Sequence, residues 1–444
     1  MNYRVIPPDG YLEGRMKLPL SKSMSNRALI INRLTPGAGP LTELADCDDT
    51  RLLREALADD SLTEVNVGAA GTAMRFLTAY FASQPGRTVR IDGSERMRQR
   101  PIGPLVDALN RLGGEVEYLG VYGFPPLKIT GKRLKGGSLN VDSTVSSQYI
   151  SALLMVAPTM EEGLTLELEG ETVSLSYIKM TLAMMESAGV ESDYFRYTIT
   201  VKPGQQYSSP TLPIEPDWSA ASYGYEIQSL ASGEMVLEGL EPESVQGDSR
   251  VAEIFSNLGV ETEFTVDGAS LTASPESSPR LQLDLSDNPD LVPAIVVTCA
   301  LLGIPFRLSG LETLRIKETD RLRALRDEVL KLGIVLTIEG DGVLVWEGAR
   351  RPITELPVFD TYDDHRMAMA LAPVALFLPG IVVRDADVVT KSFPEYWNQL
   401  EAMGFRLLDP AVAPEGEEDP FEPVAPDSPV APSVDPLTPQ GSPL

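Results

Sequence analysis

The segment LSKSMSNRALI, residues 20–30, begins with cations and hydroxyls and ends as an apolar helical run. Lys22 and Arg27 stand within the first turns of the helix that this run predicts. A helix N-terminus exposes unpaired N–H groups and partial positive charge, so it binds anions. The two cations would strengthen such a site for a phosphate or a carboxylate. A serine N-cap with a solvated lysine and arginine is the alternative, and this segment alone leaves both interpretations open.

Polar and cationic residues stand at the predicted starts of other helices as well. VGAAGTAMRFL has Gly68 and Gly71 in a tight turn, where a missing side chain lets the backbone approach an anion closely. In SERMRQRPIGPL, Arg100 directly precedes a proline that would open a helix. Taken one by one, these features also fit ordinary capping and solvation. The remaining polar residues of this kind are Ser146, Ser147 and Gln148 in STVSSQYISALL, Ser174 and Tyr177 in VSLSYIKM, and Lys391 in VTKSFPEYW.

Three segments of the second half carry carboxylates near predicted helix starts, and two of them also carry cations. Asp290 heads the apolar run DNPDLVPAIVVTCALLG. In LRIKETDRLRAL, Lys317 and Arg321 are four residues apart and would share one face of a helix, with Glu318 between them. In TYDDHRMAMALAPVAL, Arg366 follows the only histidine of the chain. An N-cap, a salt-bridge ladder and a structural histidine are the alternatives to a functional site in these segments.

The charge of the chain makes this pattern informative. The net charge is −27, and residues 409–444 hold eight carboxylates and no Lys or Arg, which leaves −19 on the rest. Dispersed surface charges of so acidic a body would not gather at helix starts. One cleft that binds a polyanionic substrate explains them together. The cations concerned are Lys22, Arg27, Arg100, Lys317, Arg321, Arg366 and Lys391.

Length and composition exclude several classes of protein. A chain of 444 residues with 43% hydrophobic residues predicts a soluble globular protein of two or three domains. The acidic charge argues against a nucleic-acid partner. Cys47 and Cys299 indicate neither a disulfide framework nor a metal site, so we expect a reducing cytoplasm and no metal or cofactor.

Two segments look unusual for a folded domain. Residues 367–383 are uncharged and apolar, but a membrane span needs about 20 residues, and prolines interrupt this run. We therefore expect a buried helix, a turn and a strand there, and no membrane segment or signal peptide. Residues 409–444 contain ten prolines and predict a disordered acidic tail.

A repeated pattern organises the remaining chain. Five predicted helices each end at a glycine that precedes an alternating strand, and the glycines are separated by 76, 70, 74 and 71 residues. Such spacing predicts repeated α/β units, with a sixth around DDTRLLREALADD and two domains of three units each. The glycines are Gly113, Gly189, Gly259, Gly333 and Gly404.

The motifs SKSMSNRAL, AGTAMR, RPIGPLVDAL, SSQY, RIKETDRL and DDHRMAMA together resemble the 5-enolpyruvylshikimate-3-phosphate synthase family. The resemblance spans about residues 5–408. It implies an α/β (α+β) fold of two domains, each with three βαβαββ-type units in an inside-out α/β barrel, with helix N-termini facing the interdomain cleft. We expect residues 1–18 plus 216–408 to form one domain and residues 19–215 the other.

The resemblance also implies the reaction and the roles of the residues. The enolpyruvyl group of phosphoenolpyruvate would pass to the 5-hydroxyl of shikimate 3-phosphate, in a monomer. Asp290, Glu318 and Lys22 would be catalytic. The residues implied for shikimate 3-phosphate are Lys22, Ser23, Arg27, Ser146, Ser147, Gln148, Ser174, Tyr177, Asp290, Thr313 and Lys317. Those implied for phosphoenolpyruvate are Lys22, Gly71, Arg100, Gln148, Arg321, Arg366 and Lys391.

The chain departs from the common pattern of the family at Ala69, Phe76 and Thr313. These departures leave the proton-transfer residues intact. The related UDP-N-acetylglucosamine enolpyruvyltransferases use a cysteine on a mobile loop, and neither cysteine here stands in such a place. A catalytically silent polyanion-binding protein is the alternative from another class.

Overall fold

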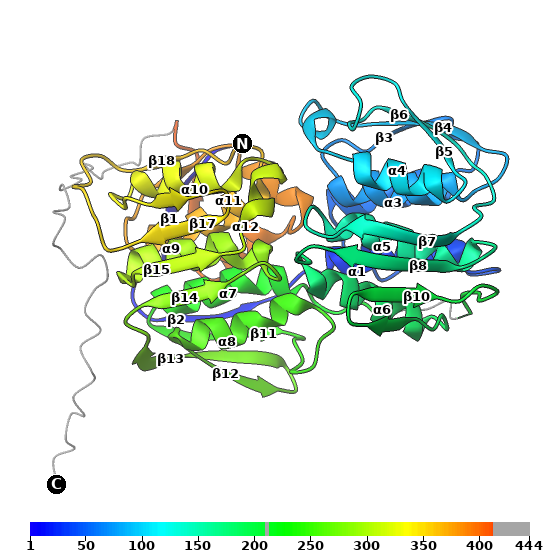
Figure 1. The fold of residues 1–444 in the computed structure, drawn as a ribbon. Helices are drawn as coiled ribbons and strands as arrows, with labels where there is room; N and C mark the ends of the chain where they lie inside the picture. Colours follow the sequence, from blue (N-terminus) through cyan, green and yellow to red (C-terminus); the bar gives the residue numbers. More distant parts are fainter. Residues whose placement is uncertain (209–212, 412–444) are drawn as a thin grey trace, which may run out of the picture.

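The computed structural model describes residues 1–208 and 213–411, and within them buried apolar side chains form two separate cores. One core uses residues between Met24 and Tyr207, and we call the elements around it the first body. The other combines residues 5–18 with residues 218–405, and its elements are the second body. The two bodies lie side by side, and strand β1 (Tyr3–Ile6) belongs to the second one (Figure 1).

The first body places its helices inside and its sheets outside. α3 and α5 are buried on nearly all sides, because GTAMRFLTAYFA and SQYISALLMV are almost wholly apolar. Strands such as β8 and β10 alternate between buried and more exposed residues, so only one face of each sheet covers the helices. Its elements are α1 (Lys22–Leu34), α2 (Asp48–Ala58), β3 (Glu64–Asn66), α3 (Gly71–Ala82), β4 (Thr88–Asp92), the 3₁₀ helix η1 (Met97–Gln99), α4 (Gly103–Arg111), β5 (Glu115–Tyr118), β6 (Leu127–Thr130), β7 (Gly137–Asp142), α5 (Ser147–Val156), η2 (Ala157–Thr159), β8 (Leu164–Glu169), α6 (Leu175–Ser187), β9 (Asp193–Phe195) and β10 (Thr198–Val201).

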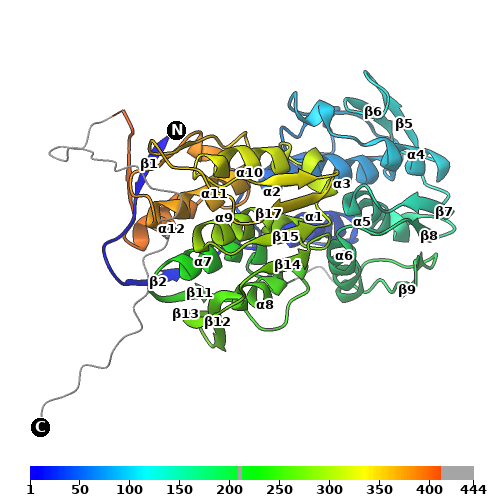
Figure 2. The ribbon, with the colours of Figure 1, turned by 60° about the vertical axis from the view of Figure 1, so that its left-hand side comes forward.

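The second body follows the same plan. Its helix α9 has the sequence VPAIVVTCALL, buried nearly throughout, and ends where Gly303 takes the left-handed φ of 74°. Figure 2 shows α9 between α10 and α7 in the interior of this body. Its elements after β1 are β2 (Leu12–Met16), α7 (Trp218–Leu230), β11 (Gly233–Glu238), η3 (Gly247–Arg250), α8 (Val251–Ser256), β12 (Leu258–Thr265), β13 (Gly268–Ser277), β14 (Leu281–Asp284), η4 (Pro289–Leu291), α9 (Val292–Leu302), β15 (Phe306–Ser309), η5 (Glu312–Ile316), α10 (Arg321–Leu330), β16 (Thr337–Glu339), β17 (Val343–Trp346), β18 (Val358–Phe359), α11 (His365–Leu371), η6 (Ala372–Leu376), β19 (Val382–Val383), η7 (Ala386–Lys391), α12 (Tyr396–Ala402) and β20 (Arg406–Leu408).

Within residues 1–208 and 213–411, the strands form five four-stranded sheets with one pairing pattern. In each sheet a parallel pair is followed by two antiparallel pairs. The fold is therefore mixed α/β with several small sheets, as the sequence predicts. The described residues from 19 to 62 contribute α1 and α2 but no sheet strand. The spatial orders are β3-β4-β6-β5, β7-β8-β10-β9, β2-β11-β13-β12, β14-β15-β17-β16 and β18-β19-β1-β20.

The five glycines of the sequence repeat take the conformation that their positions require. All have positive φ, between 73° and 97°, which side chains with a Cβ rarely adopt. The strand at or after each glycine is β5, β9, β12, β16 or β20, and each of these lies at the edge of its sheet. The predicted succession of helix, glycine and strand is thus confirmed at all five positions.

The chain passes between the bodies through two adjacent segments. Leu20 and Pro216 form an antiparallel bridge, the Ser21 N–H donates to the Glu215 carbonyl, and the Asp217 N–H donates to the Pro19 carbonyl. Both crossings therefore lie together.

The apolar segment 367–383 is a buried part of the second body. It contains most of α11, all of η6 and β19, which confirms the predicted helix, turn and strand. Among the described helices, none is both long and apolar enough to cross a membrane. The predicted acidic tail lies almost wholly outside the described residues, since these end at residue 411.

Candidate active site

A cavity lies between the two bodies and takes its lining from both. The lining carries seven cations and three carboxylates, an excess of four positive charges in a chain of net charge −27. All predicted site residues line it except Lys391. Its charged lining residues are Lys22, Arg27, Arg75, Arg100, Lys317, Arg321, Arg366, Asp49, Asp290 and Glu318.

The start of α1 brings Lys22 to the cavity. The Ser21 hydroxyl caps this helix by accepting from the Met24 N–H at 3.4 Å, so Lys22 is the first helical residue. Its Nζ lies 3.5 Å from Oδ2 of Asp49. Burial lowers the pKa of Lys22, but the Asp49 carboxylate raises it, and the net pKa lies above its usual value. Lys22 is therefore a charged ammonium in the free protein.

Arg27 is a buried cation with neutral neighbours. Its Nε donates to Thr181 Oγ1 at 2.7 Å and its Nη2 to Ser151 Oγ at 3.2 Å, while the guanidinium lies 5.4 Å from the centre of the Phe76 ring. Within the part of the chain that the structure describes, it has no carboxylate partner. Burial lowers the pKa of Arg27 to about 10. A buried charge without a counterion is costly, so an anion in the cavity would stabilise it.

Two further helix starts present polar groups to the cavity. Ser146 caps α5, since its Oγ accepts from the Gln148 N–H at 3.3 Å, and Gln148 Nε2 donates to Thr72 Oγ1 at 3.4 Å. Ser174 precedes α6 in a left-handed conformation, with φ 53°. Ser147 is the first residue of α5 and lines the cavity with them. These helix starts therefore present hydroxyls, an amide and terminal N–H groups to a ligand.

Asp290 joins the two bodies inside the cavity. It accepts from the Tyr177 hydroxyl of the first body at 3.2 Å and from Arg366 Nη2 at 2.8 Å. Its Oδ1 lies 3.2 Å from Arg321 Nη1 and 3.7 Å from Lys317 Nζ. Burial raises the pKa of Asp290, but Arg366, Lys317 and Arg321 outweigh burial and hold the pKa well below its usual value. Asp290 is therefore an ionised carboxylate, able to accept a proton.

Arg321 is completely buried and lies among three carboxylates. Its Nε and Nη2 donate to Asp364 at 2.8 and 3.2 Å, Nη2 donates to Glu318 at 3.0 Å, and Nη1 donates to Asp290 at 3.2 Å. Burial lowers the pKa of Arg321, but the three carboxylates raise it above the usual value. Its side chain is thus a fixed positive charge at the back of the cavity.

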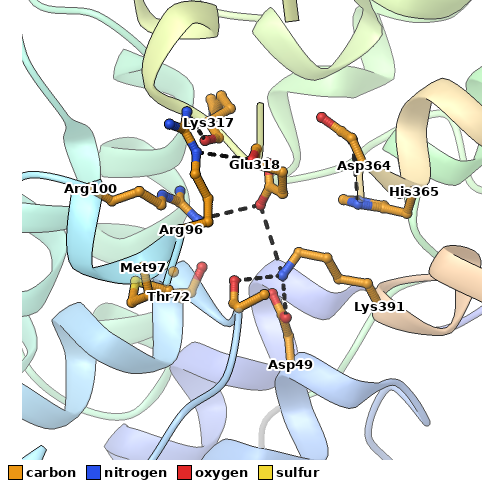
Figure 3. Close-up of polar contacts among 12 residues, drawn as sticks. Asp49, Thr72, Arg96, Met97, Arg100, Lys317, Glu318, Asp364, His365 and Lys391 are labelled. Carbon is orange, nitrogen blue, oxygen red and sulfur yellow. Dashed lines mark hydrogen bonds and ion pairs between the residues drawn. The ribbon is translucent and has the colours of Figure 1, made fainter. Parts of the chain in front are cut away.

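Glu318 lies at the centre of a group of cations (Figure 3). Its Oε1 is 3.5 Å from Arg100 Nη1 and 3.8 Å from Lys391 Nζ. Lys391 also donates to Asp49 Oδ1 at 2.7 Å and to the Ala69 carbonyl at 2.9 Å, so its side chain approaches Glu318 without lining the cavity. Burial raises the pKa of Glu318, yet Arg100, Lys391 and Arg321 hold it well below its usual value.

Three details of the sequence interpretation are wrong. Pro101, which follows Arg100, does not open a helix, since α4 begins at Gly103 and has Pro104 in its first turn. Helix α10 begins at Arg321, because the Asp320 carboxylate caps it by accepting from the Arg323 N–H at 3.3 Å. Lys317 and Glu318 therefore precede the helix, and Lys317 does not share a helical face with Arg321. Lys391 ends the 3₁₀ helix η7 instead of standing at the start of a helix.

Several polar atoms around the cavity have no hydrogen-bond partner among the described residues. They are Nε of Arg100, Oγ1 of Thr313 and both ring nitrogens of His365, all buried. Burial, followed by the nearby Lys22 and Arg366 charges, lowers the pKa of His365 well below its usual value, so the ring is neutral. Buried polar atoms are almost always paired, so these atoms indicate a site for a polar ligand.

The chain matches the family described as EPSP synthase (3-phosphoshikimate 1-carboxyvinyltransferase) over residues 57–400. A 3-phosphoshikimate 1-carboxyvinyltransferase of Bacteroides fragilis (strain YCH46) is 48% identical over 409 residues, with 92% of this chain and 99% of that protein covered. The chain belongs to the EPSP synthase family. A 3-phosphoshikimate 1-carboxyvinyltransferase of Shewanella halifaxensis (strain HAW-EB4) is 35% identical, with 91% of this chain and 100% of that protein covered.

A solved structure of EPSP synthase from Acinetobacter baumannii shares the fold. It superimposes with a TM-score of 0.73 at 20% identity and covers 92% of this chain and 100% of that one. Members of the EPSP synthase family are transferases that move an enolpyruvyl group in the shikimate pathway. This chain is therefore an enzyme of aromatic amino-acid biosynthesis.

The departures from the common EPSP synthase pattern all lie near this cavity. Ala69 has no side-chain amide, but its carbonyl accepts from Lys391 at 2.9 Å. Phe76 packs its ring against the Arg27 guanidinium. Thr313 lines the cavity with a hydroxyl that has no partner among the described residues. A Cβ at Gly71 would lie 2.6 Å from Arg100 Nη1, so glycine lets this guanidinium cover the start of α3.

Sequence reasoning missed several side chains that hold the site together. Asp49 pairs with both Lys22 and Lys391, and Asp364 binds Arg321. Arg75 lines the cavity and donates to the Gly71 and Pro101 carbonyls and to the Met97 sulfur, and burial lowers its pKa to about 10. The acidic run DCDDT at the start of a predicted helix was the only local signal for Asp49. The described residues include no group of three or more His, Cys, Asp or Glu that could hold a metal ion.

Proposed function

We propose that this enzyme transfers the enolpyruvyl group of phosphoenolpyruvate to the 5-hydroxyl of shikimate 3-phosphate, with release of phosphate. The observation that carries the proposal is the cavity lining, with seven cations and three carboxylates in a chain of net charge −27. Each substrate has one phosphate and one carboxylate group, so together they carry about five to six negative charges, which more than offset this positive excess. The two buried carboxylates Asp290 and Glu318 would supply proton transfer in the same cavity.

Shikimate 3-phosphate would bind mainly to the first body. Arg27 would take an anionic group, since it has no counterion among the described residues. Asp290 and Lys317 would hold the ring from the second body. Hydroxyls at the helix starts would hydrogen-bond the phosphate and the ring. The residues proposed for this substrate are Lys22, Ser23, Arg27, Ser146, Ser147, Gln148, Ser174, Tyr177, Asp290, Thr313 and Lys317.

Phosphoenolpyruvate would bind between the guanidinium groups of both bodies. Arg100 comes from the first body, and Arg321 and Arg366 come from the second. Arginine matches phosphate and carboxylate oxygens by paired N–H donors, which favours these residues as the clamp. The full set proposed for this substrate is Lys22, Gly71, Arg100, Gln148, Arg321, Arg366 and Lys391.

Catalysis would proceed by addition and elimination. Glu318 would protonate the methylene carbon, and the 5-hydroxyl oxygen would attack the resulting cationic carbon while Asp290, assisted by Lys22, takes its proton. The bond to phosphate would then break as the departing phosphate oxygen takes up the proton held by Asp290, and the methyl group would return one proton to Glu318 as the double bond forms again. Arg100, Lys391 and Arg321 lower the pKa of Glu318, and the last two belong to its own body, so the carboxyl is ionised before the substrates bind. The anionic donor would partly neutralise these cations, so the pKa of Glu318 would rise and the carboxyl could carry the proton.

We also propose a division into two domains, residues 1–18 plus 216–408 and residues 19–215, each of three related units. The two separate cores support this division. The common pairing pattern of the five sheets supports related units, of which three sheets belong to the second body and two to the first. We further propose a monomer and a cytoplasmic location, and the free, buried Cys47 and Cys299 fit that location.

Phosphate release tests the proposed function. The purified chain should release phosphate from phosphoenolpyruvate only when shikimate 3-phosphate is present, and Asp290→Asn should lower turnover by at least about a hundredfold. Release with UDP-N-acetylglucosamine as acceptor would point to the related transferases instead. Binding of both substrates without any turnover would refute the proposal in favour of a silent binding protein.

A further inference from the structure

Arg96 links the first body to the main chain of the second. It directly precedes η1, and its side chain is partly buried. Its Nε donates to the Glu318 carbonyl at 3.0 Å, and its Nη2 donates to the Lys317 carbonyl at 3.1 Å and the Arg315 carbonyl at 3.5 Å (Figure 3). Among the described residues it has no carboxylate partner. Its guanidinium therefore hydrogen-bonds to main-chain oxygens of the second body.

The segment that Arg96 holds carries two of the proposed site residues. Residues 317–320 connect η5 to α10, and the carbonyls at the end of a helix bear partial negative charge, which favours a cation. Within the second body the same segment is held by Arg315, whose side chain donates to the Asp341 carbonyl at 2.7 Å and lies 3.4 Å from Asp320. The short connection that carries Lys317 and Glu318 is therefore held by hydrogen bonds from both bodies, and the positions of these two side chains depend on it.

The loop around η1 contacts Glu318 in two ways. Arg96 binds its main-chain oxygen, and Arg100, at the other end of η1, lies 3.5 Å from its carboxylate. A single turn of the first body thus fixes both the backbone and the charge of this residue. The hydrogen bonds beside Leu20 and Pro216 differ in kind, because they lie at the chain crossings and persist in any arrangement of the two bodies.

We propose that Arg96 is a positioning residue that acts as a latch. Its three hydrogen bonds form when the two bodies close over the substrates, and they bring the Lys317–Glu318 segment into its catalytic position. Proton transfer at the methylene carbon is thereby restricted to the closed enzyme. This inference rests on the proposed function and adds to it a group that touches neither substrate nor reacting atoms.

The test uses Arg96→Ala and Arg96→Lys, with Arg98→Ala as the matched control. Arg98 belongs to the same turn, but its side chain is 53% exposed and pairs with Asp92 of its own body at 2.7 Å. We expect Arg96→Ala to lower kcat about ten- to a hundredfold, because hydrogen bonds of a charged donor are lost. Arg96→Lys should recover part of that loss, and Arg98→Ala should stay within about twofold of wild type.

A measurement of shape separates the latch from a merely structural role. With shikimate 3-phosphate and phosphoenolpyruvate, small-angle scattering should show a smaller radius of gyration for wild type and Arg98→Ala but incomplete compaction for Arg96→Ala. The thermal midpoint of the ligand-free Arg96→Ala protein should equal that of wild type. A kcat within twofold of wild type, or full compaction of Arg96→Ala, would overturn the proposal. Absence of phosphate release by the wild-type enzyme would instead refute the proposed function.

Discussion

Replacement of Glu318 by glutamine tests the proposed proton transfer most directly. The amide keeps the shape of the side chain but cannot exchange a proton at the methylene carbon. If Glu318 serves as this acid and base, turnover should fall by about 10²–10⁴-fold, the usual contribution of such groups. If it only balances nearby cations, turnover should change far less.

The structure indicates how much stability this substitution removes. Arg321 keeps Asp364 and Asp290, and Lys391 keeps Asp49 at 2.7 Å, so only Arg100 loses its carboxylate partner. With both substrates bound and the bodies closed, we therefore expect a loss of about 1.5–3 kcal/mol in the free energy of unfolding, the range for hydrogen bonds to charged groups. The protein should remain folded, and its cations should still bind shikimate 3-phosphate.

Two assays are needed, with Asp320→Asn as the control. Phosphate release measures turnover, and calorimetry measures the affinity for shikimate 3-phosphate. Asp320→Asn removes a charge two residues away, but asparagine also caps helices well, so its turnover should stay within about twofold of wild type. Normal affinity with turnover within about tenfold of wild type in Glu318→Gln would refute the assignment of Glu318.

Three further outcomes follow from the structure. Thr181→Val removes the acceptor for Arg27 Nε, so calorimetry should show about tenfold weaker binding of shikimate 3-phosphate; Thr165→Val, on a sheet, should leave it unchanged. Scattering should show compaction of the wild-type enzyme only when both substrates, or one with an analogue of the other, are present; a constant radius of gyration would exclude closure. The pKa values of Asp290 and Glu318 lie below their ordinary values of 3.8 and 4.5, so the stability they provide is complete above about pH 5 and is lost on further acidification. The thermal midpoint of ligand-free wild type should therefore fall steeply below about pH 4, and the double variant Asp290→Asn/Glu318→Gln should show a flatter profile.

Local sequence rules were sufficient for the repeated features of the fold. A glycine after a helix commonly adopts the left-handed conformation that ends the helix, and all five repeat glycines do so. The cations near helix starts were also recognisable, because their side chains contrast with the acidic composition of the chain. The charge pattern wrongly placed Lys317 within a helix, because Asp320 caps that helix and makes Arg321 its first residue.

The partners of the site residues could not be predicted in the same way. Asp49 and Lys391 are 342 residues apart in the chain and meet only when the two bodies come together. Arg96 is one of three arginines in SERMRQRP, and its acceptors are main-chain oxygens, which leave no mark in the sequence. Tertiary contacts of this kind can be predicted only when the arrangement of the two bodies is known.

The adjacent crossings beside Leu20 and Pro216 have a consequence for the order of folding during synthesis. The first body is a continuous insertion, complete once residue 215 has left the ribosome. The second body must wait, because β2 pairs with β11 at residues 233–237 and β1 pairs with β19 and with β20 at residues 406–408. The first body can therefore fold beside the tunnel exit while the strands that precede it, β1 and β2, stay unpaired. Since domains generally fold as units while the chain grows, the nascent polypeptide must keep β2 available until residue 237 has emerged and β1 available until residue 408 has emerged.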